Sequence, residues 1–508
     1  MPRKISKRTS FSSEESQQLE IKTVEVEVIS DADLERPGRT SFSRIQGLPR
    51  TEPPLFENKL VETIATGAPV LSATQAFLRT PDWSEFEPGR LYFQRQFGKG
   101  RFIQFFVLNK QEHQAGSITS QAEAEILNQY GVMAARLHAI FATYASIQNE
   151  PWKQPFYLLG TDLIKTLRIR NSHKFTKSDK LRAIAELAWV VGTLGAVVTW
   201  REGDLDLCIR ERSLLWIVSV EEYTQTDINT QAEELREVVI RVQPGQWTLR
   251  FLNREGAQQR KALYQYGLIP EPVFAIDPNR HKIATSMALY LIQNSRAHPQ
   301  GIYRVSTLLE SVLPGCDIQK AISDRRYGWK LKESVDNALL TLKDQLHIDL
   351  EFDDITYPLW LRPLWSLPDE LANKSAKERN QDLLGAKCLP NNYLTKHWFP
   401  AKLIFTLPET IQNQLNSIGA KRLLKASQDS QPLPHHHPDL LDASLQSEPE
   451  EQLLSGSTIK TARQAQGLTQ SALAIRVNKS VSWIKMVECD KRKAGKDDRE
   501  LLCQVLNI

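Results

Sequence analysis

The most specific arrangement of polar and small residues lies between Arg463 and Glu488. Gly467 is a residue type that ends helices, whereas Thr469 and Ser480 are residue types that cap helix N-termini. The spacing predicts three short helices, the first ending at Gly467 and the next two beginning after Thr469 and Ser480. Such an arrangement can hold a helix in the major groove of DNA, where side chains contact base edges.

The same stretch resembles the Cro/C1 (XRE) helix-turn-helix family over about 50 residues. The resemblance implies that Arg463 and Glu488 form a structural pair that locks the first helix to the third. It further implies that Gln470 contacts phosphate and that the outward face of the third helix contacts bases. The DNA-binding residues implied in this way are Gln470, Lys479, Ser480, Val481, Ser482, Lys485 and Met486.

Two further groups of basic residues lie earlier in the chain, each close to the start of a long amphipathic helix. The first group is Arg168, Arg170, Lys174, Lys177 and Lys180, and the second is Arg325, Arg326, Lys330 and Lys332. Basic residues at the start of a recognition helix are well placed to contact phosphate. A solvated helix face explains such a charge run equally well, so both interpretations stay open.

The elements predicted around these two groups occur twice in one order. The first copy has a helix from Ser120, a strand at 156–158, a helix capped by Thr161, a longer helix through 181–194 and a hairpin at 197–209. The second copy has a helix from Asp277, a strand at 303–305, a helix capped by Thr307, a long helix at 331–346 and a strand at 348–352. Two strands, 238–242 and 247–251, are predicted between the copies. This order indicates two winged-helix units.

The second copy resembles the replication initiators of bacterial plasmids. The resemblance rests on the stretches 276–280 and 304–310, on Ala338-Leu339-x-x-Leu342, and on the order of elements over roughly 150–365. It implies a protein that binds repeated sites at an origin and helps to open the duplex.

The composition excludes several classes of protein. The chain has 508 residues, a net charge of +4 and 41% hydrophobic residues, which is a globular balance. No apolar run is long enough to span a membrane, and the start of the chain lacks the apolar stretch of a secretory signal. The five cysteines are never spaced C-x-x-C, which argues against a zinc site and fits a reducing cytosol.

Sequence motifs for catalysis are also missing. The turn 97–100 is not a phosphate-binding loop, and the histidines at 435–437 lie among prolines rather than on a strand. We therefore expect no catalytic residue, no metal and no cofactor, and predict that the protein is not an enzyme.

These observations predict a mainly α fold with α+β winged-helix units. We expect a disordered or weakly ordered tail at 1–54, a first winged-helix domain with a β-rich insert at 55–270 and a second winged-helix domain with a C-terminal extension at 271–426. A flexible linker at 427–454 and a five-helix Cro/C1-type module at 455–508 complete the prediction.

The predicted function is sequence-specific binding of double-stranded DNA, most consistent with a plasmid replication initiator. A Cro/C1-type transcriptional regulator whose body senses a ligand or partner is the alternative, and a nicking enzyme is a third, weaker one. The expected partners are double-stranded DNA, replication proteins such as a helicase or its loader, and a second copy of the chain. We expect no membrane partner and a cytoplasmic location, associated with the nucleoid or a plasmid.

Overall fold

The computed structural model describes residues 5–9, 47–87, 90–98, 100–107, 120–169, 176–202, 207–226, 233–386, 389–409, 411–413, 456–466, 468–477, 479, 481–489 and 496–506. The chain divides into two compact units, Met1–Ser430 and Gln431–Ile508, called here the body and the tail module. The predicted linker at 427–454, and most of the predicted N-terminal tail, lie outside the described residues.

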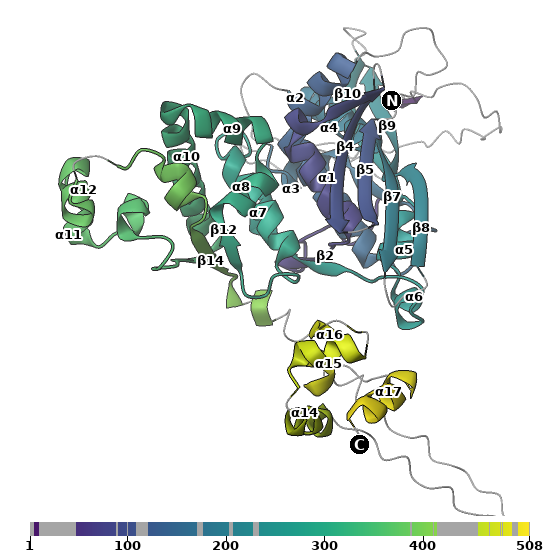
Figure 1. Ribbon diagram of the computed structural model, residues 1–508. Helices are drawn as coiled ribbons and strands as arrows, with labels where there is room; N and C mark the ends of the chain where they lie inside the picture. The colour runs from purple at the N-terminus through teal and green to yellow at the C-terminus, as the bar shows by residue number, and fades with distance from the viewer. Residues whose placement is uncertain are drawn as a thin grey trace, which may run out of the picture. The chain divides into compact units, whose positions relative to one another are not determined.

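The body is a mixture of helices and small sheets, which agrees with the α+β part of the predicted fold class (Figure 1). A five-stranded antiparallel sheet has the order β3 (Ser84–Glu87), β4 (Arg90–Gly98), β5 (Arg101–Val107), β7 (Leu194–Glu202) and β8 (Leu207–Leu214). A four-stranded sheet has the order β1 (Ile5–Thr9), β9 (Trp216–Thr226), β10 (Glu233–Pro244) and β6 (Phe156–Leu159). In addition, β2 (Val61–Ala65) pairs with β11 (Tyr266–Pro270).

Four helices pack against these sheets: α1 (Ala68–Leu78), α2 (Ser120–Ile147), α3 (Gly160–Thr166) and α4 (Lys177–Gly192). The short helix α5 (Trp247–Phe251) packs on α1, and α6 (Arg254–Gln258) has no buried residue. Phe141 of α2 meets Trp216 of β9 edge to face at 5.7 Å between ring centroids, and Trp216 meets Trp247 in the same way at 5.4 Å. Such aromatic contacts add to the free energy gained by burial. α4 lies against β9 and β10.

The core around α2 contains two ionisable side chains that are fully buried. His138 accepts a hydrogen bond at Nδ1 from Trp216 Nε1 at 2.8 Å, which leaves Nε2–H to donate to the carbonyl of Val70 at 3.1 Å. Burial lowers the pKa of His138 to about 4, so the imidazole is neutral. Arg136 donates to the carbonyl of Leu167 at 3.0 Å and to that of Phe274, and burial lowers its pKa to about 10.

The second copy begins after η3 (Glu271–Phe274). Its elements are α7 (Lys282–Asn294), β12 (Ile302–Arg304), α8 (Val305–Val312), α9 (Gly315–Ser323), α10 (Arg325–Leu346), β13 (Asp349–Phe352) and β14 (Lys402–Thr406). The three strands form one antiparallel sheet in the order β12-β14-β13. Between β13 and β14 lie η4 (Leu359–Leu361), η5 (Leu364–Ser366), α11 (Asp369–Ala372), α12 (Ala376–Leu384) and the π-helical turn η6 (Leu394–Trp398).

Several predicted helix starts are wrong. Asp277 caps only a turn, in which its carboxylate accepts from the amides of Asn279 and Arg280, and α7 begins after His281. Thr161 and Thr307 lie inside α3 and α8 rather than at their N-caps. Thr161 instead donates to the carboxylate of Glu237 at 2.6 Å. At the start of α8, the amides of Val305 and Ser306 donate to the carbonyls of Ala401 and Phe399 at 2.9 and 3.0 Å.

Two other elements differ from the prediction. Residues 247–251 form the helix α5 instead of a returning strand, because β10 ends where Gly245 passes the Leu214 carbonyl closely. A Cβ at Gly245 would lie 2.1 Å from that oxygen, and Trp247 Nε1 donates to the Leu215 carbonyl at 2.9 Å. The second copy also contains a helix, α9, that was not predicted.

The tail module contains four helices among its described residues, where five were predicted. They are α14 (Gly456–Ala465), α15 (Gln470–Arg476), α16 (Val481–Glu488) and α17 (Lys496–Leu506). Ile459, Leu473, Ile484 and Leu502, one from each helix, form its apolar core. No helix among the described residues of either unit is long and apolar enough to cross a membrane.

Candidate nucleic-acid interface

In the tail module, Arg463 of α14 and Glu488 of α16 form a bidentate ion pair. Arg463 Nε lies 2.5 Å from Glu488 Oε1, and Nη2 lies 3.1 Å from Oε2. The two side chains are 9% and 1% exposed. Burial alone would raise the pKa of Glu488, but hydrogen bonds from Arg463 and Gln470 outweigh it and lower the pKa. The pair thus joins the first and third helices of the module.

Gln470, predicted to contact phosphate, lies in this same network. Its amide nitrogen donates to Glu488 Oε2 at 2.8 Å. Arg463 also donates to the carbonyl of Leu468 at 2.7 Å, in the segment before α15. The network therefore fixes the start of α15 as well as α14 and α16.

α16 presents a mixed outer face. Trp483, Ile484 and Val487 are buried, whereas Lys485 and Met486 are exposed, Met486 by 38%. Val481 and Ser482 lie in the first turn of α16, but their side chains, and the whole of Ser480, lie outside the described residues.

Lys479, in the segment between α15 and α16, has partners within the module. Its Nζ lies 2.7 Å from Asp498 Oδ1 of α17, and it lies over the Trp483 ring at 5.4 Å from the centroid. The charge of Lys479 is therefore partly compensated before any ligand binds.

In the first basic group of the body, the described side chains either form an ion pair or are at least partly buried. Arg168 pairs with Glu271 at 3.4 Å, Lys177 is half-buried and Lys180 is buried. Burial lowers the pKa of Lys177, against the opposing effect of Glu237. Arg170 and Lys174 lie outside the described residues.

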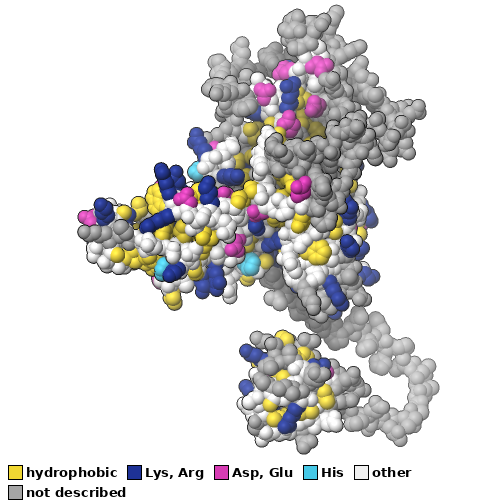
Figure 2. All heavy atoms as spheres, turned by 45° about the horizontal axis from the view of Figure 1, so that its top comes forward, with side chains coloured by type: hydrophobic (Ala, Val, Ile, Leu, Met, Phe, Trp, Pro, Cys, Tyr) yellow, Lys and Arg dark blue, Asp and Glu magenta, His cyan; other side chains and the backbone are white. Residues whose placement is uncertain are grey.

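In the second basic group, three of the four side chains are open to solvent. Arg325, Arg326 and Lys330 are exposed in the first turns of α10, whose N-cap is Asp324, whereas Lys332 is paired with Asp336 at 2.6 Å. Figure 2 shows Lys and Arg side chains beside hydrophobic ones over the part of the body that holds α9 and α10.

Sequence reasoning missed two neighbours of this surface. Trp329 is 53% exposed and lies four residues after Arg325, so the two share one face of α10. Asn391 accepts a hydrogen bond from Arg325 Nη1 at 3.1 Å and orients it. The i, i+4 spacing could have shown Trp329, but nothing local could have shown Asn391. We call Arg325, Arg326, Trp329 and Lys330 the α10 surface.

The described residues contain no group of three or more His, Cys, Asp or Glu side chains that could hold a metal ion. The histidines at 435–437 lie outside them. Comparison of the chain with protein-family models, with curated proteins and with solved structures gives no match.

Proposed function

We propose that this protein is a non-enzymatic, sequence-specific binder of double-stranded DNA of the plasmid replication-initiator kind. The observation that carries the proposal is the network of Arg463, Glu488 and Gln470. It fixes three short helices so that α16 offers Lys485 and Met486 outward. This geometry supports a Cro/C1-type helix-turn-helix, with α16 in the major groove.

The body supports a second DNA-binding surface. The second copy contains the helices α7, α8, α9 and α10, and the strand β12 lies between α7 and α8. The strands β13 and β14, which follow α10, share one sheet with β12. We propose that this arrangement is a winged helix. α10 would be its recognition helix. The α10 surface combines three cations with an aromatic ring, which suits contact with phosphate and with the sugar and base edges beside it.

Two binding surfaces in one chain favour an initiator, because origins carry repeated sites. Footprinting of the full-length protein on the DNA that flanks its own gene tests this. Repeated protected sites would support an initiator, and one palindrome over a promoter would support a regulator. A protein that contacts six to ten phosphates loses roughly 10³–10⁵ in affinity between 50 and 200 mM salt. A flat salt titration would contradict DNA binding by these surfaces.

The second candidate is a Cro/C1-type regulator whose body senses a ligand. A polar cleft of about 400 Å³ between α1, β4 and α8 favours it. A helicase, its loader and a second copy of the chain remain proposed partners of the initiator.

A further inference from the structure

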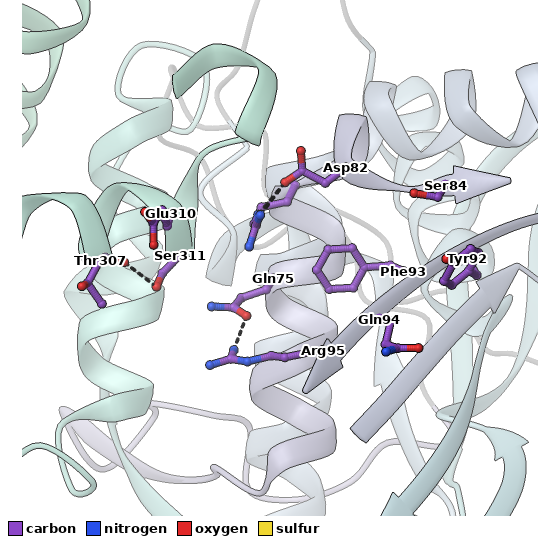
Figure 3. Close-up of a pocket in the computed structure, with 11 residues that line it drawn as sticks. Gln75, Asp82, Ser84, Tyr92, Phe93, Gln94, Arg95, Thr307, Glu310 and Ser311 are labelled. Carbon is purple, nitrogen blue, oxygen red and sulfur yellow. Dashed lines mark hydrogen bonds and ion pairs between the residues drawn. The ribbon is translucent and has the colours of Figure 1, made fainter. Parts of the chain in front are cut away.

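A cleft in the body lies between the N-terminal elements and the second copy. α1, η2 (Thr80–Asp82), β3 and β4 form one wall, and α8 forms the other (Figure 3). Its volume of about 400 Å³ is within the range of small-molecule sites, at the small end. The proposed DNA-binding surfaces do not include any of its lining residues.

The first wall carries two arginines. Figure 3 shows Arg95 and Gln75 pointing toward Thr307 and Ser311 of α8. The charge of Arg79 is compensated, because Nε and Nη2 each lie 2.7 Å from Oδ2 of Asp82. The other oxygen of Asp82 accepts from the backbone amide of Gly315 at 2.7 Å, so this carboxylate is fully engaged.

Arg95 has a different environment. It donates to the side-chain oxygen of Gln75, a neutral group, and stacks over the Phe97 ring at 5.0 Å from the centroid. No carboxylate of the described residues forms an ion pair with it. Burial lowers the pKa of Arg95, Tyr290 has a smaller, opposite effect, and the nearby charge of Arg79 acts in the same direction as burial. A half-buried cation without a counter-charge costs free energy, because its charge is partly removed from water. An anion bound in the cleft would offset that cost.

The opposite wall limits what that anion can be. α8 offers the exposed side chains of Thr307 and Glu310 and the hydroxyl of Ser311. Ser311 already donates to the Thr307 carbonyl at 2.7 Å, so its oxygen is available as an acceptor. The hydroxyl of Thr307 can donate a hydrogen bond to a polar ligand. Glu310, in contrast, would repel a second negative group of the ligand that lies close to its carboxylate. The wall therefore suits a compact oxyanion bound at the arginine side.

We propose that this cleft is a binding site for a small oxyanion-bearing metabolite, a phosphate ester or a carboxylate, held by Arg95 with Gln75. Binding at this site does not depend on the proposed DNA-binding function. Since α8 leads through α9 into α10, a ligand that bridges the two walls would also stabilise the position of the α10 surface relative to the N-terminal elements.

Calorimetric titration of the full-length protein with inorganic phosphate, and separately with acetate, at constant ionic strength tests the site. One equivalent of one of these compact anions is expected to bind; binding of phosphate indicates phosphate esters as the ligand class, and binding of acetate indicates carboxylates. Arg95→Gln should weaken that binding by about tenfold or more, since a hydrogen bond to a charged group is lost. Arg182→Gln, an exposed arginine of α4, is the matched control and should change nothing.

Two further variants keep the test independent of Arg95 and of folding. Thr307→Trp fills the cleft from an exposed helix position and should abolish binding, and Glu310→Gln removes a negative charge and should tighten it. Reversal of Arg325, Arg326 and Lys330 to Glu should leave anion binding unchanged, which separates this site from the DNA-binding surface. Absence of binding by both anions, or binding that Arg95→Gln and Thr307→Trp leave unaltered, overturns the proposal.

Discussion

α4 and α10 each begin with basic residues, but the fold uses the two helices differently. α4 contacts α2 on one side and β9 and β10 on another, and Gly192 allows this approach, since a Cβ there would lie 2.7 Å from Val218. Lys180 is buried as a result. α10 contacts α7 and α9 and keeps the α10 surface open. A basic cluster at the start of a helix is therefore a candidate interface only where that helix retains an uncovered face.

The strands of the two copies also pair with different partners. β6 pairs with β10, whereas the hairpin β7–β8 joins the five-stranded sheet through β5. In the second copy, β12, β13 and β14 share one sheet. The two copies have a similar order of elements, apart from α9, but not the same pairing of strands.

The largest expected effect comes from reversing the charge of the α10 surface. Arg325→Glu with Arg326→Glu and Lys330→Glu places three negative charges where phosphate is proposed to lie, and like charges in contact cost several kcal/mol. We expect affinity of the full-length protein for the body's own site to fall on the order of a thousandfold, measured by fluorescence anisotropy.

The matched control is on α4. Lys177→Glu with Arg182→Glu changes charge at the start of that helix, and we expect little effect on the same DNA. An equal loss of affinity in this control would remove the distinction between the two helices.

The buried pair of the tail module gives the next effect. Glu488→Ala leaves Arg463 buried without its counter-charge, so the free energy of unfolding of α14–α16 should fall by about 3–5 kcal/mol. Asp498→Ala breaks the more exposed pair with Lys479 and should cost about 0–1 kcal/mol. Hydrogen exchange of the module's amides measures both; equal protection in the two variants would contradict the role of the buried pair.

The buried His138, in the core beside α4, predicts that the stability of the body depends on pH. His138 has a pKa of about 4 in the folded protein and about 6.5 in the unfolded chain. Between these values the unfolded chain binds one more proton, so stability is complete above pH 6.5 and falls as the pH drops toward 4, by about 3 kcal/mol. Chemical denaturation across this range measures the slope. His138→Gln, which cannot titrate, should lack that part of it.

The smallest effect is expected at the tail module's outer face. Ser482→Ala with Lys485→Ala removes a base-edge contact and a cation, and should weaken the tail's own DNA site by about 1–3 kcal/mol. Protection of the body's site in a footprint should be unchanged. Loss of both protected regions would mean that tail and body do not bind DNA separately.

Much of this fold could be predicted from periodicity. The 3–4 spacing of apolar residues predicted α2, α4 and α10, and alternation predicted β8, β10 and β13. Lys180 could also have been placed correctly, since it precedes Ile184 by four residues and so lies on the apolar face of α4. The spacing of Lys332 and Asp336 similarly predicts their ion pair.

Other features could not be predicted in this way. The partner of β6 depends on chain segments about 80 residues apart, and the cleft at Arg95 joins β4 to a helix more than 200 residues later. Local spacing carries no information about such contacts. For the same reason, the hydrogen bonds of Arg136 to two distant carbonyls had no signal in the sequence.

The pairing of β2 with β11 has a consequence for how the body is made. Ala65 lies opposite Tyr266, so β2 acquires its partner strand only about 200 residues later. Ribosomes add roughly 5–20 residues per second, which leaves β2 unpaired for about 10–40 s of synthesis. Pairing of β2 with β11 also brings the start of the second copy into place. A contact between residues so far apart in the sequence is expected to slow folding. We therefore expect a chaperone to be most useful during synthesis of the N-terminal half, while β2 is still unpaired.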